Sequence, residues 1–161
     1  MAVIQRISPC LWFDSEAEPA ARCYVSVFPN SRINAISRYG EAGFEVHGRP
    51  AGSVMVVTFD LDGQSFMALN GGPVFRFTEA ISLVVHCETQ DEIDHYWTAL
   101  GAGGDPRAQQ CGWLKDRYGL SWQIVPTVIE QLMTGPRSDA VMAAVLKMKK
   151  IDLSALQAAA R

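Results

Sequence analysis

Two stretches of the sequence repeat one pattern, and this repeat constrains the fold more than any other feature. ISPCLWFDSEAE begins at Ile7 and ISLVVHCETQDE begins at Ile81. In each, an alternating apolar stretch gives way to a helical pattern, at Ser15 in the first copy and at Thr89 in the second. Ser and Thr cap the first free amides of helices, so each copy predicts a strand that leads into a helix.

A second pair of matching stretches extends the repeat. GQSFMALN from Gly63 and GLSWQIVP from Gly119 share Gly, Ser and an aromatic residue at the same steps, and each predicts a strand entered through a glycine turn. The first copy is longer than the second between its two matches. We assign the extra length to the loop GEAGFEVHGRPAG, residues 40–52, and expect mobility there.

Each copy therefore predicts a βαβββ module, a strand and a helix followed by three strands. The predicted elements are about 4–13, 16–28, 32–39, 54–61 and 65–69 in the first copy, and about 80–87, 90–100, a short strand near Pro106, 112–116 and 120–125 in the second. Asn70 to Pro73 forms the joint. A module of roughly seventy residues buries too little core alone, so we expect one domain over 1–161: module one about 1–72, module two about 73–126 and C-terminal helices about 127–161.

Composition narrows the classes of function. The 161 residues are 48% hydrophobic, carry a formal net charge of -3 and contain no long apolar run, so we expect neither nucleic-acid nor membrane partners and place the protein in the cytoplasm. The one basic cluster, Lys147, Lys149 and Lys150, is interpreted as a solvated helix terminus. The cysteines have no CxxC spacing and are expected to be reduced thiols: Cys10, Cys23, Cys87 and Cys111.

Alternation divides the side chains of each strand between two faces. One face is almost wholly apolar, includes Trp122, and should pack under the two helices. The other face mixes apolar and polar groups, as a small-molecule pocket requires, although an exposed sheet surface is the simpler alternative. The predicted ligand-binding residues on or beside this face are Ser8, Cys10, Trp12, Met67, Ser82, His86, Trp113 and Gln123.

Four stretches carry a family resemblance: PCLWFDSEAEPAARCYVSVFPNS, FMALNGGPVFRFTEAISLVV, QCGWLKDRYGLSWQIVP and VMAAVLKMKKIDLSALQAA. Together they resemble the vicinal oxygen chelate superfamily of glyoxalases, dioxygenases and bleomycin- or fosfomycin-resistance proteins. The similarity is closest to its PhnB-like branch, often labelled demethylubiquinone methyltransferase-like. The resemblance implies an α+β fold in which two tandem βαβββ modules form a curved mixed sheet around a cavity, with C-terminal helices, and it implies a homodimer.

The resemblance also implies where a metal would bind. Carried through the repeat, the ligand positions of metal-using members fall on Ser8, Met67, Ser82 and Gln123, or on Ala68 in place of Met67 if the alignment shifts by one residue. Hydroxyl and thioether groups bind divalent metal ions poorly compared with imidazole or carboxylate, so we predict no metal site. His47, His86 and His95 share no ligand-like spacing, and His86 is the best titratable candidate in the pocket.

No cofactor is predicted. A strand followed by a glycine-rich turn and a helix is typical of S-adenosylmethionine sites. Here Gly101, Gly103 and Gly104 follow a helix instead, and no helix is expected after Gly40 and Gly43. Methyl transfer therefore depends on the family label alone.

Three smaller features complete the predictions. Cys10 and His86 are a weak candidate for an activated thiol, since a neighbouring imidazole lowers the pKa of a cysteine. DRYG, residues 116–119, is interpreted as a hairpin turn rather than a catalytic motif. Beyond Pro126, an apolar stripe of Val141, Val145 and Met148 predicts a helix capped at Ser138.

The leading hypothesis is metal-independent binding of a small apolar or planar molecule, in which aromatic walls stack the ligand while Ser82 and Gln123 orient it. The alternative is an enzyme, either the methyltransferase of the family label or a glyoxalase- or dioxygenase-type metalloenzyme with an unusual ligand set. A third interpretation, an interaction module, would be favoured if the C-terminal helices filled the mixed face.

Overall fold

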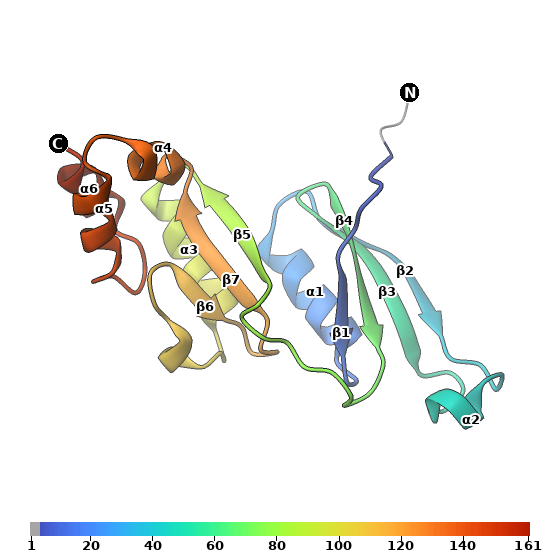
Figure 1. The fold of residues 1–161 in the computed structure, drawn as a ribbon. Coiled ribbons are helices and arrows are strands. Elements are labelled where there is room, and N and C mark those ends of the chain that lie inside the picture. The colour runs from blue at the N-terminus through green and yellow to red at the C-terminus, as the bar shows by residue number, and fades with distance from the viewer. Residues whose placement is uncertain (1–3) are drawn as a thin grey trace. The chain divides into compact units, whose positions relative to one another are not determined.

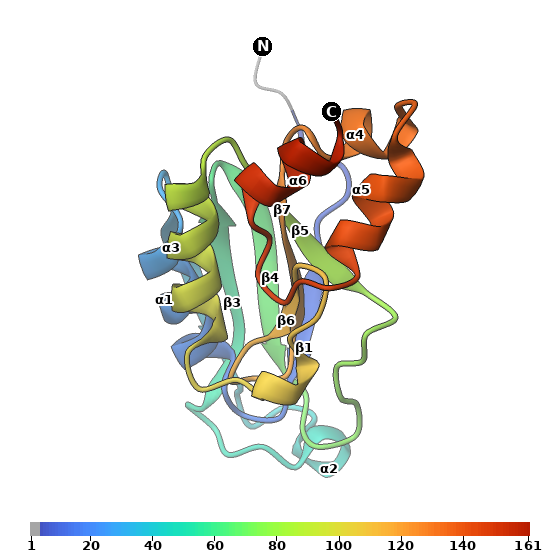
Figure 2. The ribbon, with the colours of Figure 1, turned by 90° about the vertical axis from the view of Figure 1, so that its left-hand side faces the viewer.

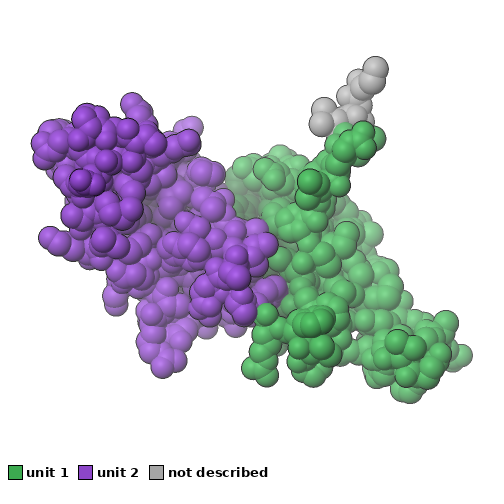
Figure 3. Space-filling model, in the orientation of Figure 1, with its two compact units in different colours: residues 1–76 green, residues 77–161 purple. Residues whose placement is uncertain are grey.

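The computed structural model describes residues 4–161 and divides the chain into two compact units, Met1–Arg76 and Phe77–Arg161 (Figure 1 and Figure 3). Each unit contains one sheet, and the boundary lies close to the predicted joint at Asn70 to Pro73. The packing of both units as one domain stays a prediction. No helix among the described residues is long and apolar enough to cross a membrane.

The first unit has the predicted order of strands and helices with one addition. Its elements are β1 (Cys10–Phe13), α1 (Ala17–Val27), β2 (Arg32–Arg38), α2 (Phe44–His47), β3 (Val54–Leu61) and β4 (Gln64–Asn70). The strand order is β1-β4-β3-β2, in which β1 is parallel to β4 and the other pairs are antiparallel. The added element, α2, lies in the loop that lengthens the first copy.

The core of the first unit lies between α1 and its sheet. The helix buries Tyr24 and three alanines, Ala17, Ala20 and Ala21, and the small alanine side chains let the helix lie close to the strands. The sheet contributes Val57, Phe59 and Ala68, all fully buried. These residues alternate along β3 and β4 as a half-covered sheet requires.

The start of α1 differs from its prediction. Ser15 does not cap the helix, which begins at Ala17 after Glu16 and has no cap from its own neighbours. Instead, Asn70 at the end of β4 accepts a hydrogen bond from the Ala17 amide through Oδ1, at 2.8 Å. The cap therefore comes from 53 residues away in the sequence, beyond the reach of a local motif.

The second unit contains β5 (Ser82–Cys87), α3 (Gln90–Gly101), a 3₁₀ turn η1 (Pro106–Ala108), β6 (Trp113–Lys115) and β7 (Ser121–Pro126). The strand order is β5-β7-β6, with β5 parallel and β6 antiparallel to β7 (Figure 2). The predicted cap of α3 is confirmed, because Thr89 Oγ1 accepts a hydrogen bond from the Glu92 amide at 3.2 Å.

The short strand predicted near Pro106 is wrong. Asp105 accepts a hydrogen bond from the Arg107 amide at 2.9 Å and caps η1, and Pro106 suits a first helical position because it has no amide proton to leave unpaired. Between η1 and β6, the strand pairing is limited to an isolated bridge between Gln110 and Trp113. In its regular strands the second module is therefore βαββ rather than βαβββ.

The C-terminal tail, residues 127–161, forms α4 (Ile129–Thr134), α5 (Ser138–Val145) and α6 (Leu153–Ala159). Its core is Val141, Ile151 and Leu156. Ser138 is the first residue of α5 and makes no cap, and the helix ends at Val145. The predicted stripe thus runs past the helix, but Val145 and Met148 still pack against the tail core.

Hydrogen bonds attach the tail to the second unit's α3 and to the loop before β6. The side chain of Gln90 donates to the Ile151 carbonyl at 3.0 Å and accepts from the Leu153 amide at 2.8 Å. The amides of Cys111 and Gly112 donate to the carbonyls of residues 148 and 149. Lys150 is exposed, as the sequence predicted, and it also forms an ion pair with Asp94 at 2.6 Å.

Candidate functional site

The pairing of strands in the second unit arranges the mixed face of its sheet in rows. Ser82, Ser121 and Lys115 are neighbours across β5, β7 and β6, and Val84, Gln123 and Trp113 form the next row. His86 and Val125 follow. Paired residues of adjacent strands point to the same side of a sheet, so all eight side chains share one face. We call this set the second-sheet face.

Three of the predicted site residues are brought together in the second-sheet face. Gln123 Nε2 donates a hydrogen bond to Ser82 Oγ at 2.9 Å, and Trp113 lies directly opposite Gln123 across the β6–β7 pair. His86 lies one row further on the edge strand β5 and is exposed. Val84, between Ser82 and His86 on the same face, is 45% exposed and adds apolar surface to it.

The opposite face of the same sheet is core. Val85, Cys87, Trp122 and Ile124 are buried there. The prediction that Trp122 belongs to the core while Gln123 points to the other face is therefore confirmed. Alternation alone was sufficient for this assignment.

One end of the second-sheet face carries charge. Lys115 Nζ forms an ion pair with Glu79 Oε1 at 2.5 Å, and the lysine side chain is only 26% exposed whereas that of Glu79 is 64% exposed. The hydrogen bond from Lys115 holds the pKa of the Glu79 carboxyl below its ordinary value. Between Lys115 and Ser82 lies Ser121, which is 1% exposed, and its hydroxyl has no hydrogen-bond partner among residues 4–161.

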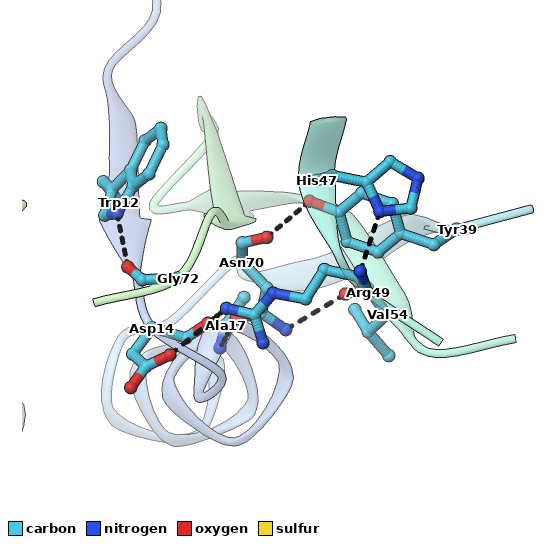
Figure 4. Close-up of polar contacts among 9 residues, drawn as sticks. All are labelled: Trp12, Asp14, Ala17, Tyr39, His47, Arg49, Val54, Asn70 and Gly72. Atoms are coloured by element: carbon cyan, nitrogen blue, oxygen red, sulfur yellow. Dashed lines mark hydrogen bonds and ion pairs between the residues drawn. The ribbon is translucent and has the colours of Figure 1, made fainter. Parts of the chain in front are cut away.

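The other four predicted site residues lie in the first unit. Cys10 pairs with Met67 across β1 and β4, and Trp12 follows on the same face. Trp12 Nε1 donates to the Gly72 carbonyl at 2.9 Å, and a Cβ on Gly71 would overlap the indole, so the glycine is needed for this position of the ring (Figure 4). Ser8 precedes β1 and accepts a hydrogen bond from Gln5 at 3.3 Å. The eight residues thus form two sets of four, one in each unit.

A polar network at the end of β4 was not predicted (Figure 4). Besides capping α1, Asn70 donates to the Val54 carbonyl at 3.2 Å, and its own carbonyl accepts from Tyr39 Oη at 2.6 Å. Arg49 reaches from the long loop to Asp14 Oδ1 at 3.1 Å. A buried asparagine closing an apolar strand was the one local signal, but the sequence was interpreted there as a joint.

His47 belongs to the same network. Its Nδ1 accepts the Arg49 amide at 2.9 Å, and its ring lies 4.5 Å from that of Tyr39. The loop of residues 40–52 is therefore attached to β1 and β2 through several contacts. These contacts are structural, and the histidine has no acidic or thiol partner among them.

The DRYG segment is confirmed as a turn. Asp116 is 5% exposed and accepts hydrogen bonds from the Tyr118 amide at 2.8 Å, the Leu120 amide at 3.1 Å and Trp122 Nε1 at 2.9 Å. Its carboxylate is thus used in holding the β6–β7 hairpin to the core tryptophan. A general base would need a free acceptor near the mixed face.

Two of the thiols, Cys10 and Cys87, have pKa values shifted away from activation. Partial burial raises the pKa of the Cys10 thiol, opposite to what activation requires. Burial raises the pKa of Cys87 to about 11, with Glu92 as a second cause. Both shifts favour the inert protonated thiol.

The residues at the family's metal positions do not fit a metal ion. They are two hydroxyls, a thioether and an amide, and Ser82 and Gln123 are hydrogen-bonded to each other. Among residues 4–161, no three His, Cys, Asp or Glu side chains converge on one point. This donor set lacks the imidazoles and carboxylates that bind such ions.

The glycines that were candidates for a cofactor loop have other roles. A Cβ on Gly104 would overlap the Lys115 carbonyl, so this glycine lets the chain pass close to β6. Gly103 has φ +77 and follows α3. Gly43 precedes only the four-residue helix α2. None of them joins the end of a strand to the start of a long helix.

Comparisons with known proteins place the chain in a family. The family model described as 3-demethylubiquinone-9 3-methyltransferase matches residues 5–125, so the C-terminal tail lies beyond the matched range. No curated protein matches the chain.

Solved structures agree with the family model. A PhnB protein from Bacillus cereus is 39% identical, with TM-score 0.65, over 76% of this chain and 100% of that one. A protein from Pseudomonas aeruginosa is 20% identical, with TM-score 0.57, over 76% and 98% of the two chains. The fosfomycin resistance protein FosX from Listeria monocytogenes is 14% identical, with TM-score 0.50, over 81% and 98%, and supports the fold alone. The chain therefore belongs to the 3-demethylubiquinone-9 3-methyltransferase (PhnB-like) family and has the vicinal oxygen chelate fold.

Proposed function

We propose that the protein binds a small apolar or planar molecule against the second-sheet face, without a metal ion. The observation that carries the proposal is the Gln123–Ser82 hydrogen bond of 2.9 Å beside the half-buried indole of Trp113. An oriented polar pair next to an aromatic surface is the arrangement that small-molecule sites use to combine affinity with orientation.

The division of labour follows from the side chains. Trp113 stacks a planar ligand, and Val84 and Val125 add apolar surface beside it. The side-chain NH₂ group of Gln123 donates to Ser82. The side-chain carbonyl oxygen of Gln123 is then left to accept a hydrogen bond from the ligand. Ser8, Cys10, Trp12 and Met67 provide a second candidate surface in the first unit.

The choice of a metal-free site rests on the donor set at Ser8, Met67, Ser82 and Gln123. Titration of the chelator-treated protein with Zn²⁺, Ni²⁺ and Mn²⁺ should give no stoichiometric binding. Sub-micromolar binding of one ion would instead favour a metalloenzyme and require a new ligand set.

Calorimetric titration with a neutral planar molecule tests the proposed site, and a short-chain ubiquinone analogue is a suitable probe because of the family's name. Gln123→Leu and Trp113→Ala should each weaken binding by about tenfold, the effect of one lost hydrogen bond or stacked ring. Gln157→Leu, an exposed position on α6, is the matched control and should bind as the unaltered protein does. Unchanged affinity in both site variants would refute this location.

The description of the matched family favours a second candidate, methyl transfer to such a molecule. This activity requires S-adenosylmethionine, and the glycines of the chain do not offer the usual loop for it. Calorimetric titration with S-adenosylmethionine separates the two candidates, since tight binding would favour the transferase and no binding would favour ligand capture.

We also infer a homodimer and a cytoplasmic location. Exposed apolar side chains support association: Ile7, Val74, Ile81 and Leu146 are each more than half exposed. Analytical ultracentrifugation at micromolar concentration should give twice the chain mass of 17.7 kDa. A single species at the chain mass would refute the dimer.

A further inference from the structure

The polar row of the second-sheet face contains more hydrogen-bond donors than acceptors. Ser82, Ser121 and Lys115 lie side by side across the three strands. The Ser82 oxygen already accepts from Gln123, and its proton has no acceptor among residues 4–161. The Ser121 hydroxyl has no partner there at all, and Lys115 contributes an ammonium group.

The buried Ser121 hydroxyl is costly unless something pairs with it. An unsatisfied hydroxyl that is 1% exposed loses its hydration without compensation, and such groups are rare in folded proteins. Alanine would fit the same strand position without this cost. The hydroxyl is therefore explained if the row receives a ligand atom that accepts hydrogen bonds.

The ammonium group of Lys115 favours a negatively charged ligand atom at this row. Its side chain is mostly buried, and its one ion-pair partner, Glu79, lies in the segment before β5 and is 64% exposed. Because exposed ion pairs contribute little stability, the Glu79 carboxylate can leave when another anion arrives. The Lys115 ammonium group is thus already paired with a carboxylate, that of Glu79.

We infer that this row is a subsite for an oxyanion, a carboxylate or phenolate oxygen carried by the planar ligand. The oxygen accepts hydrogen bonds from the hydroxyls of Ser82 and Ser121 and from the Lys115 ammonium, and it replaces Glu79 there. The ring then extends along the face toward Trp113 in the next row. This inference rests on the proposed function and specifies its ligand class.

The test compares naphthoate with its neutral amide, two planar probes that differ in charge. Calorimetric titration of the protein should show naphthoate binding about tenfold more tightly than the amide, as one charge-assisted hydrogen bond predicts. Lys115→Met should abolish most of this preference and Ser121→Ala should reduce it, because each change weakens naphthoate binding more than binding of the neutral amide. Glu79→Gln should strengthen naphthoate binding several-fold, because it removes the competing carboxylate.

Matched controls are Lys147→Met and Ser154→Ala, exposed positions in the tail, which should keep the preference. Equal binding of both probes to the unaltered protein, with the amide still sensitive to Gln123→Leu, would refute the oxyanion subsite and leave the proposed function standing. A preference that persists in Lys115→Met would also refute it. Binding of neither probe would overturn both the subsite and the ligand class of the proposed function.

Discussion

Replacing Asp116 with asparagine should destabilise the protein strongly, although the two side chains have almost the same shape. The carboxylate accepts three hydrogen bonds, from the amides of Tyr118 and Leu120 and from the indole of Trp122. An asparagine can orient its oxygen toward the two amides. Its NH₂ group then faces the Trp122 N–H, so two donors oppose each other in a buried site.

The magnitude follows from the loss of charge and of one partner. Hydrogen bonds to a charged group contribute about 1.5–3 kcal/mol each against about 1 for neutral ones, and a buried unpaired donor costs about 1–3 kcal/mol. Allowing for relaxation of the turn, we expect Asp116→Asn to lower the free energy of unfolding by about 3 kcal/mol. Asp62→Asn, at an exposed turn, should change it by less than about 0.5 kcal/mol.

The assay is urea-induced unfolding followed by far-ultraviolet circular dichroism, run as a double-mutant cycle with Trp122→Phe. Phenylalanine removes the indole donor, so Asp116→Asn should cost about 1.5 kcal/mol less in that background. Equal costs in the two backgrounds would refute the opposed donors. A total cost below about 1 kcal/mol for Asp116→Asn would refute the structural role of the carboxylate.

Three further predictions concern other parts of the chain. Gly71→Ala should displace the indole of Trp12 and destabilise the protein by about 1–3 kcal/mol, with a shift of tryptophan emission, whereas Gly40→Ala, which meets no atom within 4 Å, should do neither. Because burial raises the pKa of Cys87 from 9.0 to about 11, the thiol favours the folded state below pH 9 and this contribution is lost as pH rises through about 11. The free energy of unfolding of Cys87→Ala, measured by urea denaturation, should therefore fall less between pH 9 and pH 11 than that of the unaltered protein. An equal fall in the two proteins would contradict the assignment. Gln90→Met should lose both hydrogen bonds to the C-terminal tail and speed amide exchange in α6 while leaving the first unit unchanged, and unaltered exchange would show that the tail is held by its apolar core.

Local sequence patterns were sufficient for the strands other than the one expected near Pro106, and for the faces of the strands. The repeat located β1, β4, β5 and β7, and alternation assigned Trp122 to the core and Gln123 to the other side. Thr89 was identified as a cap because its partner, Glu92, lies three residues away. These features depend only on neighbours in the chain.

The errors arose where a distant residue competes with a local signal. Ser15 has the right type for a cap, but Asn70 reaches the helix start across the sheet. Near Pro106, the apolar and polar pattern was too short to separate a strand from a turn capped by Asp105.

The candidate site was also predictable only in part. The grouping of Ser82, Gln123 and Trp113 could be predicted because strand alternation places them on one face. The Lys115–Glu79 pair and the unpartnered hydroxyl of Ser121 could not be predicted, since they depend on where the segment before β5 lies and on which atoms are excluded from water.

The most direct test of the central claim is to record amide and indole NMR signals of the isotope-labelled protein while naphthoate is added. Binding at the second-sheet face predicts that the largest shifts occur at the Trp113 indole, the Gln123 side-chain amide and the backbone of Ser121. Large shifts confined to other residues, or no shifts at millimolar naphthoate, would contradict the account.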